Sequence, residues 1–93
     1  MSNDTTSPNQ SLLTFPCDFT IKVFGTASNE FEASVSQIIR QHIPDLPEGA
    51  VQIRQSANSK YSAMSVTVHV TSKEQLDNIY QNLTASPLVL MAL

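Results

Sequence analysis

Residues 61–71 read YSAMSVTVHVT and set the architecture of the chain. From Met64 to Val70 every second residue is apolar, and the residues between them are serine, threonine and histidine. A side-chain period of two predicts a strand with one buried face and one polar face. Segments of helical period flank this strand on both sides. We therefore predict an α+β fold whose sheet keeps its polar face uncovered, and any activity should reside on that face.

Upstream of this strand, the pattern predicts another strand and a helix. Apolar and polar residues alternate over residues 18–24, and Gly25 is expected to close this strand in a tight turn. Asn29 and Glu32 have the spacing of a capping box, which predicts the start of a helix. An apolar stripe with helical spacing then runs through residues 31–42.

The remaining segments complete a two-fold pattern. Residues 51–54 alternate and predict a short strand, and residues 56–60 predict a turn in which an asparagine takes the left-handed conformation. Ser72 and Gln75 repeat the capping-box spacing at the start of a second helix. A last strand is predicted over residues 88–93.

The predicted order is strand, helix, strand, strand, helix, strand. Right-handed crossovers place both helices on one face of a four-stranded antiparallel sheet, with the first and third strands in the centre. This is the ferredoxin-like βαββαβ arrangement. Residues 1–11 are polar without an apolar anchor and are expected to be a disordered tail, so residues 12–93 form the single predicted domain.

Composition excludes several functional classes. The net charge of −3 argues against a constitutive nucleic-acid binder and against an electrostatic membrane anchor. No apolar run approaches the roughly 20 residues that span a bilayer, and the N-terminus lacks the features of a signal peptide. The single cysteine, Cys17, permits no internal disulfide. We expect a soluble cytoplasmic protein.

Binding residues are predicted on the open sheet face. A cation on a central strand amid hydroxyl groups suits a carboxylate or phosphate. The alternative is a solvated or dimer-covered sheet face on which Lys22 is an ordinary surface lysine. Hydroxyl residues are also common strand formers. The candidate ligand- or partner-binding residues are Lys22, Phe24, Arg54, Tyr61, Ser65, Thr67, His69, Leu88 and Leu90.

The last strand leaves two registers open. If Val89, Met91 and Leu93 face the core, then Leu88 and Leu90 point outward. They would then lie beside Phe24 of the first strand. An apolar cluster on an exposed edge strand favours self-association or partner docking. In the reversed register, Leu88 and Leu90 belong to the core.

The sequence offers no catalytic or metal-binding constellation. Cys17, His42 and His69 lie on different predicted elements without metal-ligand spacing. His69 has no carboxylate nearby in sequence, so no nucleophile with a positioned base is visible. We therefore expect no enzyme, no metal and no cofactor.

The same order of elements occurs in RNA-recognition modules, small hydrolases and amino-acid-sensing regulatory domains, so the topology by itself does not indicate the function. RNA recognition needs aromatic residues on the two central strands, where the third strand offers serine, threonine and histidine. We expect no nucleic-acid partner. A protein-interaction or regulatory module is favoured by an apolar face, whereas a sensor of a small anionic metabolite is favoured by an anion pocket around Lys22.

The chain also resembles the bacterial YbeD-like proteins. Leu12, Phe15-Pro16, Phe19, Lys22 and Gly25 match their opening pattern L-x-x-F-P-x-x-F-x-x-K-x-x-G, and Ser56, Tyr61, Ser65, Thr67 and Thr71 are similar to their hairpin and third strand. The closing Val89-Leu-Met-Ala-Leu93 resembles their V-x-M-V-L end. The resemblance implies an ACT-like βαββαβ fold and little about activity. Genes of the family often lie beside those for lipoate attachment, which implies a regulatory link to lipoate metabolism.

The chain departs from that family at two places. Asn58-Ser59 stands in the hairpin where the family usually has Lys-Gly, and Leu90 stands where members often carry a basic residue. These differences favour an apolar interface over an anion-binding role for the hairpin and the edge strand.

Overall fold

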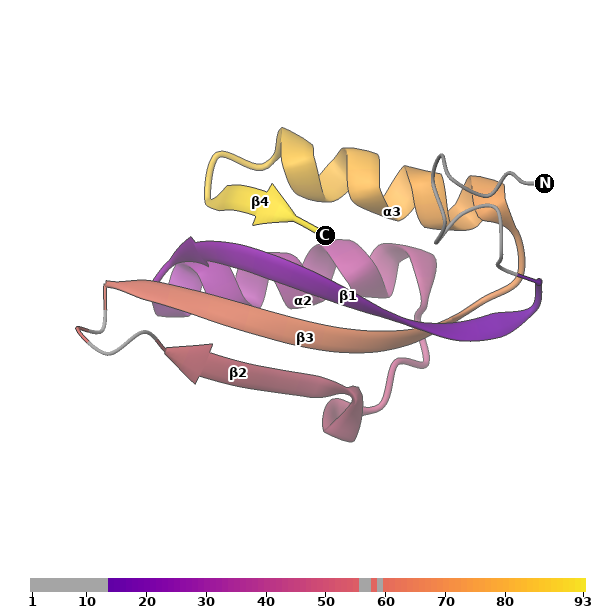
Figure 1. The fold of residues 1–93 in the computed structure, drawn as a ribbon, viewed down its shortest axis with the longest axis horizontal. Helices are drawn as coiled ribbons and strands as arrows, with labels where there is room; N and C mark the ends of the chain where they lie inside the picture. Colours follow the sequence, from indigo (N-terminus) through magenta and orange to yellow (C-terminus); the bar gives the residue numbers. More distant parts are fainter. Residues whose placement is uncertain (1–13, 56–57, 59) are drawn as a thin grey trace, which may run out of the picture.

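The computed structural model describes residues 14–55, 58 and 60–93 (Figure 1). The predicted tail, residues 1–11, and most of the predicted hairpin turn lie outside the described residues. Asn58 is described, and its side-chain oxygen accepts a hydrogen bond from the Lys60 amide at 3.2 Å. The elements are β1 (Cys17–Thr26), α2 (Asn29–His42), the 3₁₀ turn η1 (Glu48–Ala50), β2 (Val51–Gln55), β3 (Tyr61–Val70), α3 (Lys73–Ala85) and β4 (Val89–Ala92).

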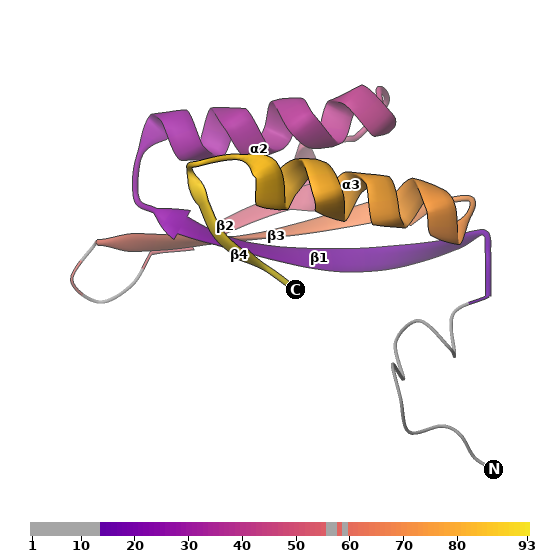
Figure 2. The same ribbon diagram turned by 90° about the horizontal axis from the view of Figure 1, so that it is seen from above.

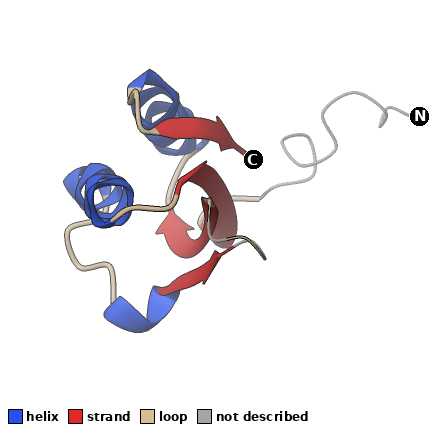
Figure 3. Cartoon of the chain, turned by 90° about the vertical axis from the view of Figure 1, so that its left-hand side faces the viewer, coloured by secondary structure: helices blue, strands red, loops and turns tan. Residues whose placement is uncertain are grey.

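The predicted topology is confirmed. The four strands form one sheet in the order β2-β3-β1-β4, and every neighbouring pair is antiparallel. The central strands pair without interruption from Cys17 opposite Val70 to Thr26 opposite Tyr61. Both helices lie on the same side of the sheet, and no described helix covers the other side (Figures 2 and 3). Neither described helix has the length and hydropathy that crossing a membrane requires.

The core fills the space between this side of the sheet and the helices. Every second side chain of β1 and β3 packs against the apolar residues on one face of α2 and α3, because alternate side chains of a strand point to the same face of the sheet. Ser62 is the one buried polar residue, and its hydroxyl has no hydrogen-bond partner in the described chain. The buried apolar residues are Ile21, Val23, Phe31, Val35, Ile39, Ile43, Leu46, Met64, Val66, Val68, Val70, Leu76, Ile79 and Leu83.

Serine side chains cap both helices. Ser72 accepts a hydrogen bond from the Gln75 amide at 3.1 Å, which agrees with the predicted start of α3. For α2 the predicted cap was wrong by one residue: Ser28 is the cap and accepts from the Phe31 amide at 3.0 Å. Serine and asparagine are comparably good caps, so the sequence did not distinguish Ser28 from its neighbour.

Gly25 does not have the predicted role of closing a tight turn. It lies within β1, and no described glycine has a positive φ. A side chain at this position would overlap the buried ring of Phe31 and the carbonyl oxygen of Leu88. Gly25 is therefore required by the close approach of α2 and the chain entering β4.

The last strand follows neither predicted register. Gly25 pairs with Val89 but Phe24 pairs with Met91, so Leu90 is an extra residue in a β-bulge. Leu88, which one of the two registers placed on the open face, is partly buried against the core together with Val89 and Ala92. The exposed side chains of this segment are those of Leu90, Met91 and Leu93.

Candidate functional site

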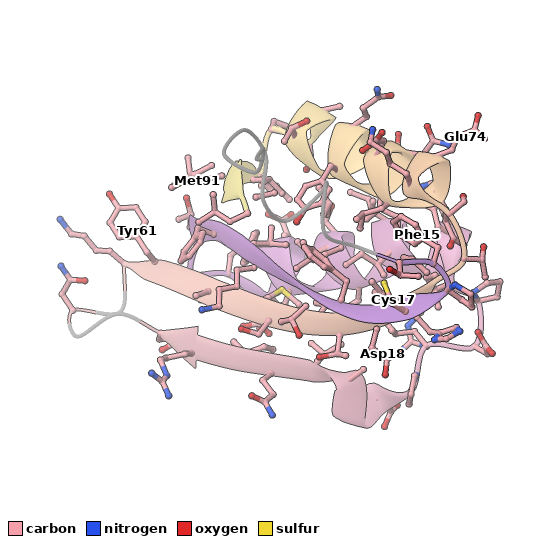
Figure 4. All side chains as sticks on the ribbon, turned by 45° about the vertical axis from the view of Figure 1, so that its right-hand side comes forward. Phe15, Cys17, Asp18, Tyr61, Glu74 and Met91 are labelled. Atoms are coloured by element: carbon pink, nitrogen blue, oxygen red, sulfur yellow. The ribbon has the colours of Figure 1, made fainter. Side chains whose placement is uncertain are left out.

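The bare side of the sheet, called here the open face, presents its side chains in rows across the strands. The register of β2, β3 and β1 determines which side chains are neighbours. Tyr61 and Asp18 mark the two ends of the paired central strands (Figure 4). From the hairpin end the rows are Arg54, Ala63 and Phe24; Gln52, Ser65 and Lys22; Thr67 and Thr20; and His69 and Asp18.

Two of these rows surround a hollow of about 390 Å³, the basic hollow. Lys22 and Arg54 come from the strands on either side of β3, and the small residues Ala63 and Ser65 lie between them. The described residues that line this hollow include no Asp or Glu. The lining residues are Lys22, Phe24, Gln52, Ile53, Arg54, Ala63 and Ser65.

The two cations of the basic hollow have no ion-pair partner among the described residues. Within the described residues the ion pairs are His69–Asp18 and Lys73–Asp77, and neither involves Lys22 or Arg54. The chain as a whole is acidic, with eight Asp and Glu residues against five Lys and Arg residues. An uncompensated pair of cations beside hydroxyl and amide groups is an arrangement suited to an oxyanion.

A second, smaller hollow adjoins the first at the hairpin end. Its volume is about 200 Å³, and it shares Phe24, Arg54 and Ala63 with the basic hollow. Tyr61 adds a second aromatic ring, so we call this the aromatic hollow. The remaining lining residues are Gln55 and Ser62.

The C-terminal segment adds an exposed apolar edge to the same half of the open face. Met91 lies opposite Phe24, and Leu93 is paired with Lys22 through backbone hydrogen bonds of 2.9 and 2.7 Å. Leu90, Met91 and Leu93 are 62%, 49% and 60% exposed, and we call these three the apolar edge. These are large exposed fractions for apolar side chains in so small a domain.

The opposite end of the open face has different chemistry. Asp18 and His69, which pair across β1 and β3, make a hydrogen bond of 2.9 Å between Oδ1 and Nδ1. Both side chains are well exposed. The neighbouring hydroxyl of Thr67 makes its hydrogen bond with Thr20 at 3.1 Å, so among the described residues His69 contacts no hydroxyl or thiol nucleophile.

A further hollow of about 460 Å³ lies at this end, between the sheet and the loop that leads to η1. Its polar lining includes the carboxylates of Asp18 and Asp45 beside His69. The described residues contain no group of three or more side chains placed to hold a metal ion. The acidic character of this end contrasts with the basic hollow.

The structure therefore groups the predicted residues differently from the sequence pattern. Lys22, Phe24, Arg54 and Ser65 share one hollow, and Tyr61 adjoins it. Thr67 and His69 line the acidic end, and Leu88 packs against the core. The Asp18 partner of His69 was missed, although counting residues back along the alternating first strand would have placed it on the same face. Gln52, Ala63, Met91 and Leu93 also lie on this face, although they were not among the predicted binding residues.

His42 and Cys17 lie apart from the open face. The side-chain amide of Asn82 on α3 donates to Nε2 of His42 in the last turn of α2 at 2.6 Å, which ties the two helices together. Cys17 is a half-buried free cysteine at the start of β1 and packs against the core.

Comparison with known proteins shows the family to which this chain belongs. The family model described as "Protein of unknown function (DUF493)" matches residues 10–93. The UPF0250 protein of Chromobacterium violaceum is 44% identical over 84 residues, which cover 90% of this chain and 94% of that protein. The UPF0250 protein of Neisseria gonorrhoeae is 42% identical over 83 residues, covering 89% and 91%. These names indicate no catalytic family.

A solved structure has the same fold. The solution structure of protein HP0495 from H. pylori superposes with a TM-score of 0.72, covering all of this chain and 94% of that one. At 18% identity this likeness concerns the fold alone. With the family match over most of the chain, the resemblance to YbeD-like proteins is confirmed, and the chain belongs to the DUF493 family.

Proposed function

We propose that this domain is a non-catalytic binding module that docks a protein partner on the hairpin half of its open face. The observation that supports this most strongly is the apolar edge, which lies exposed beside Phe24 on a face that neither helix covers. Exposed apolar groups next to polar ones are typical of protein-interaction surfaces. Among the described residues His69 hydrogen-bonds to Asp18 and to no hydroxyl or thiol nucleophile, which favours binding over catalysis.

The chemistry of the partner follows from the surroundings of this edge. Lys22 and Arg54 flank the apolar groups and carry no ion pair within the described chain. A fitting partner presents apolar side chains bordered by carboxylates, because charge complementarity steers association and excludes wrong partners. We further propose that docking regulates the partner in the cytoplasm, and the YbeD-like resemblance suggests lipoate metabolism as the process.

The proposal is tested by substituting one exposed apolar side chain. A partner is first isolated by affinity capture from the native cell, and its affinity is then measured with purified proteins. Met91→Glu introduces a charge opposite Phe24 and should weaken the complex about tenfold or more, because central apolar contacts dominate interfaces. Gln37→Glu adds the same charge at an exposed position of α2 and is the matched control.

The two variants separate a specific loss from a general effect of charge. Weaker binding by Met91→Glu with unchanged binding by Gln37→Glu supports docking on the open face. Equal affinities for both variants and the unaltered protein contradict it. Sedimentation of the protein alone shows whether the partner is a second copy, in which case Met91→Glu should yield monomers.

A second candidate function is the sensing of a small anionic metabolite. It is favoured by the shape of the site: Lys22 and Arg54 come from the strands on either side of β3 and line one hollow.

A further inference from the structure

We infer that the basic hollow and the aromatic hollow together form one binding site for a small organic oxyanion. The ligand has a phosphate or carboxylate head, held between Lys22 and Arg54, and an aromatic or aliphatic body that lies against Phe24 and Tyr61. This site deepens the second candidate function and does not depend on protein docking.

The strand register brings the two cations to one place. Lys22 lies opposite Ser65 from β1, and Arg54 lies opposite Ala63 from β2. Because neighbouring strands are about 4.8 Å apart, β1 and β2 are separated by about 9.6 Å across β3. Lysine and arginine side chains are long enough to reach over the intervening strand from both sides.

The residues between the cations leave room for a ligand head. Ala63 and Ser65 are the small floor of the basic hollow, so neither fills the space between Lys22 and Arg54. The Ser65 hydroxyl and the Gln52 amide can both donate hydrogen bonds into it. Arginine binds phosphate and carboxylate groups with two parallel hydrogen bonds, and lysine adds a point charge.

The charge distribution indicates that the head is an anion. Lys22 and Arg54 are both exposed, and the described chain offers neither of them an ion-pair partner. Two like charges around one hollow repel each other, and a bound anion offsets this repulsion. An oxyanion supplies the missing charge. Among the described residues, the acidic side chain in the rows of the open face is that of Asp18, in the row farthest from Arg54, where it does not compete for these cations.

The second hollow indicates that the ligand also has an apolar body. Phe24 and Arg54 border both hollows, so a head in one continues directly into the other. The rings of Phe24 and Tyr61 provide apolar surface on which a flat or aliphatic group can pack. At about 390 Å³, the basic hollow falls in the range of small-ligand sites.

Phenyl phosphate is a probe that carries both features. It is titrated into the isotope-labelled protein while the backbone amide signals are followed by NMR. We expect shifts confined to the facing stretches of β1, β2 and β3. Lys22→Gln and Arg54→Gln should each weaken binding about tenfold, because hydrogen bonds to charged groups are worth more than neutral ones. Lys73→Gln removes the same charge from α3 and should leave binding unchanged.

Companion probes identify which part of the ligand is recognised. Inorganic phosphate tests the head alone, phenylacetate replaces phosphate by carboxylate, and benzyl alcohol tests the ring alone. Phenyl phosphate or phenylacetate should bind more tightly than inorganic phosphate and benzyl alcohol. Whichever of the two organic anions binds more tightly shows whether the preferred head group is a phosphate or a carboxylate.

Three results would overturn the site. The first is that no backbone amide signal shifts with phenyl phosphate or phenylacetate up to about 20 mM. The second is that the shifted signals belong to the helices and not to the open face, and the third is that Lys73→Gln weakens the binding of phenyl phosphate as much as Lys22→Gln does. The dispersion of the amide spectrum shows directly that each variant is folded. Failure here leaves the docking test with Met91→Glu unaffected, so the two proposals can fail separately.

Discussion

Val66 and Thr67 are adjacent on the central strand β3, yet they belong to surfaces with opposite properties. Val66 is fully buried beneath the helices, whereas Thr67 is exposed on the open face. The covered face of the sheet is almost entirely apolar, while the open face carries charged, hydroxyl and aromatic groups in rows. One strand therefore serves folding with half of its residues and offers the other half for binding.

This separation has an energetic consequence. A side chain that packs between sheet and helices cannot change without altering the free energy of unfolding, since protein interiors are close-packed. A side chain on the open face contacts water on one side, and its replacement there usually changes stability by less than about 0.5 kcal/mol. Matched substitutions on the two surfaces test whether the separation is real.

Gly25→Ala should show the largest effect. The added methyl group would meet the ring of Phe31 and the backbone oxygen of Leu88, and backbone atoms cannot swing aside as the end of a flexible side chain can. We expect a loss of about 3 kcal/mol, as is typical of overpacking a tight core. Urea unfolding followed by circular dichroism measures the change.

Gly49→Ala is the control for this prediction. Gly49 is exposed, and nothing lies within 4 Å of the position that its side chain would occupy. Its substitution should leave stability within about 0.5 kcal/mol of the unaltered protein. Equal stabilities for the two variants would mean that the junction of β1, α2 and β4 is looser than the contacts of Gly25 indicate.

Ser62→Ala should have a smaller effect of the opposite sign. Ser62 is 2% exposed, and its hydroxyl has no hydrogen-bond partner in the described chain. A buried unpaired hydroxyl is unfavourable, so its removal should raise the free energy of unfolding by about 1 kcal/mol. Ser65→Ala makes the same change on the open-face side of β3, where we expect no measurable effect. A loss of stability in Ser62→Ala would reveal a partner for the hydroxyl.

The covered face was the more predictable of the two surfaces. The alternation from Met64 to Val70 and the two helical stripes predict the element order, the sheet order and the face that the helices cover, and all three are confirmed. These features follow from burial, which the periodicity of apolar residues reports directly. The cap at Ser28 was missed by one residue because adjacent residues can perform the same role.

The open face was predictable only in part. Lys22, Phe24, Arg54 and Ser65 were expected there, but their common hollow depends on the register between strands, which one sequence does not specify. The bulge at Leu90 is a stronger case. In a segment that is apolar at nearly every position, alternation cannot show where an extra residue is inserted, so the exposure of Met91 was left open between the two predicted registers.

The smallest expected effect concerns Tyr80 on α3, which packs against the core. Burial raises the pKa of the Tyr80 hydroxyl above its ordinary value of 10.0, since the charged phenolate is poorly solvated there. Below the unfolded-state pKa the hydroxyl is protonated in both states and the effect on stability is constant. As the pH rises from the unfolded-state pKa towards the raised folded-state pKa, the folded protein binds more protons than the unfolded chain, so stability falls.

Tyr80→Phe should therefore reduce the loss of stability at alkaline pH. Urea midpoints of the variant and the unaltered protein are compared from about pH 8 to about pH 11. The difference between the two proteins cancels every titrating group that they share. The difference in urea midpoint should stay constant at the lower pH values and change in favour of Tyr80→Phe at the higher pH values. A difference in urea midpoint that is independent of pH would mean that Tyr80 on α3 is as open to water as the open face of the sheet. The contrast between the covered and the open surfaces would then not extend to this side of α3.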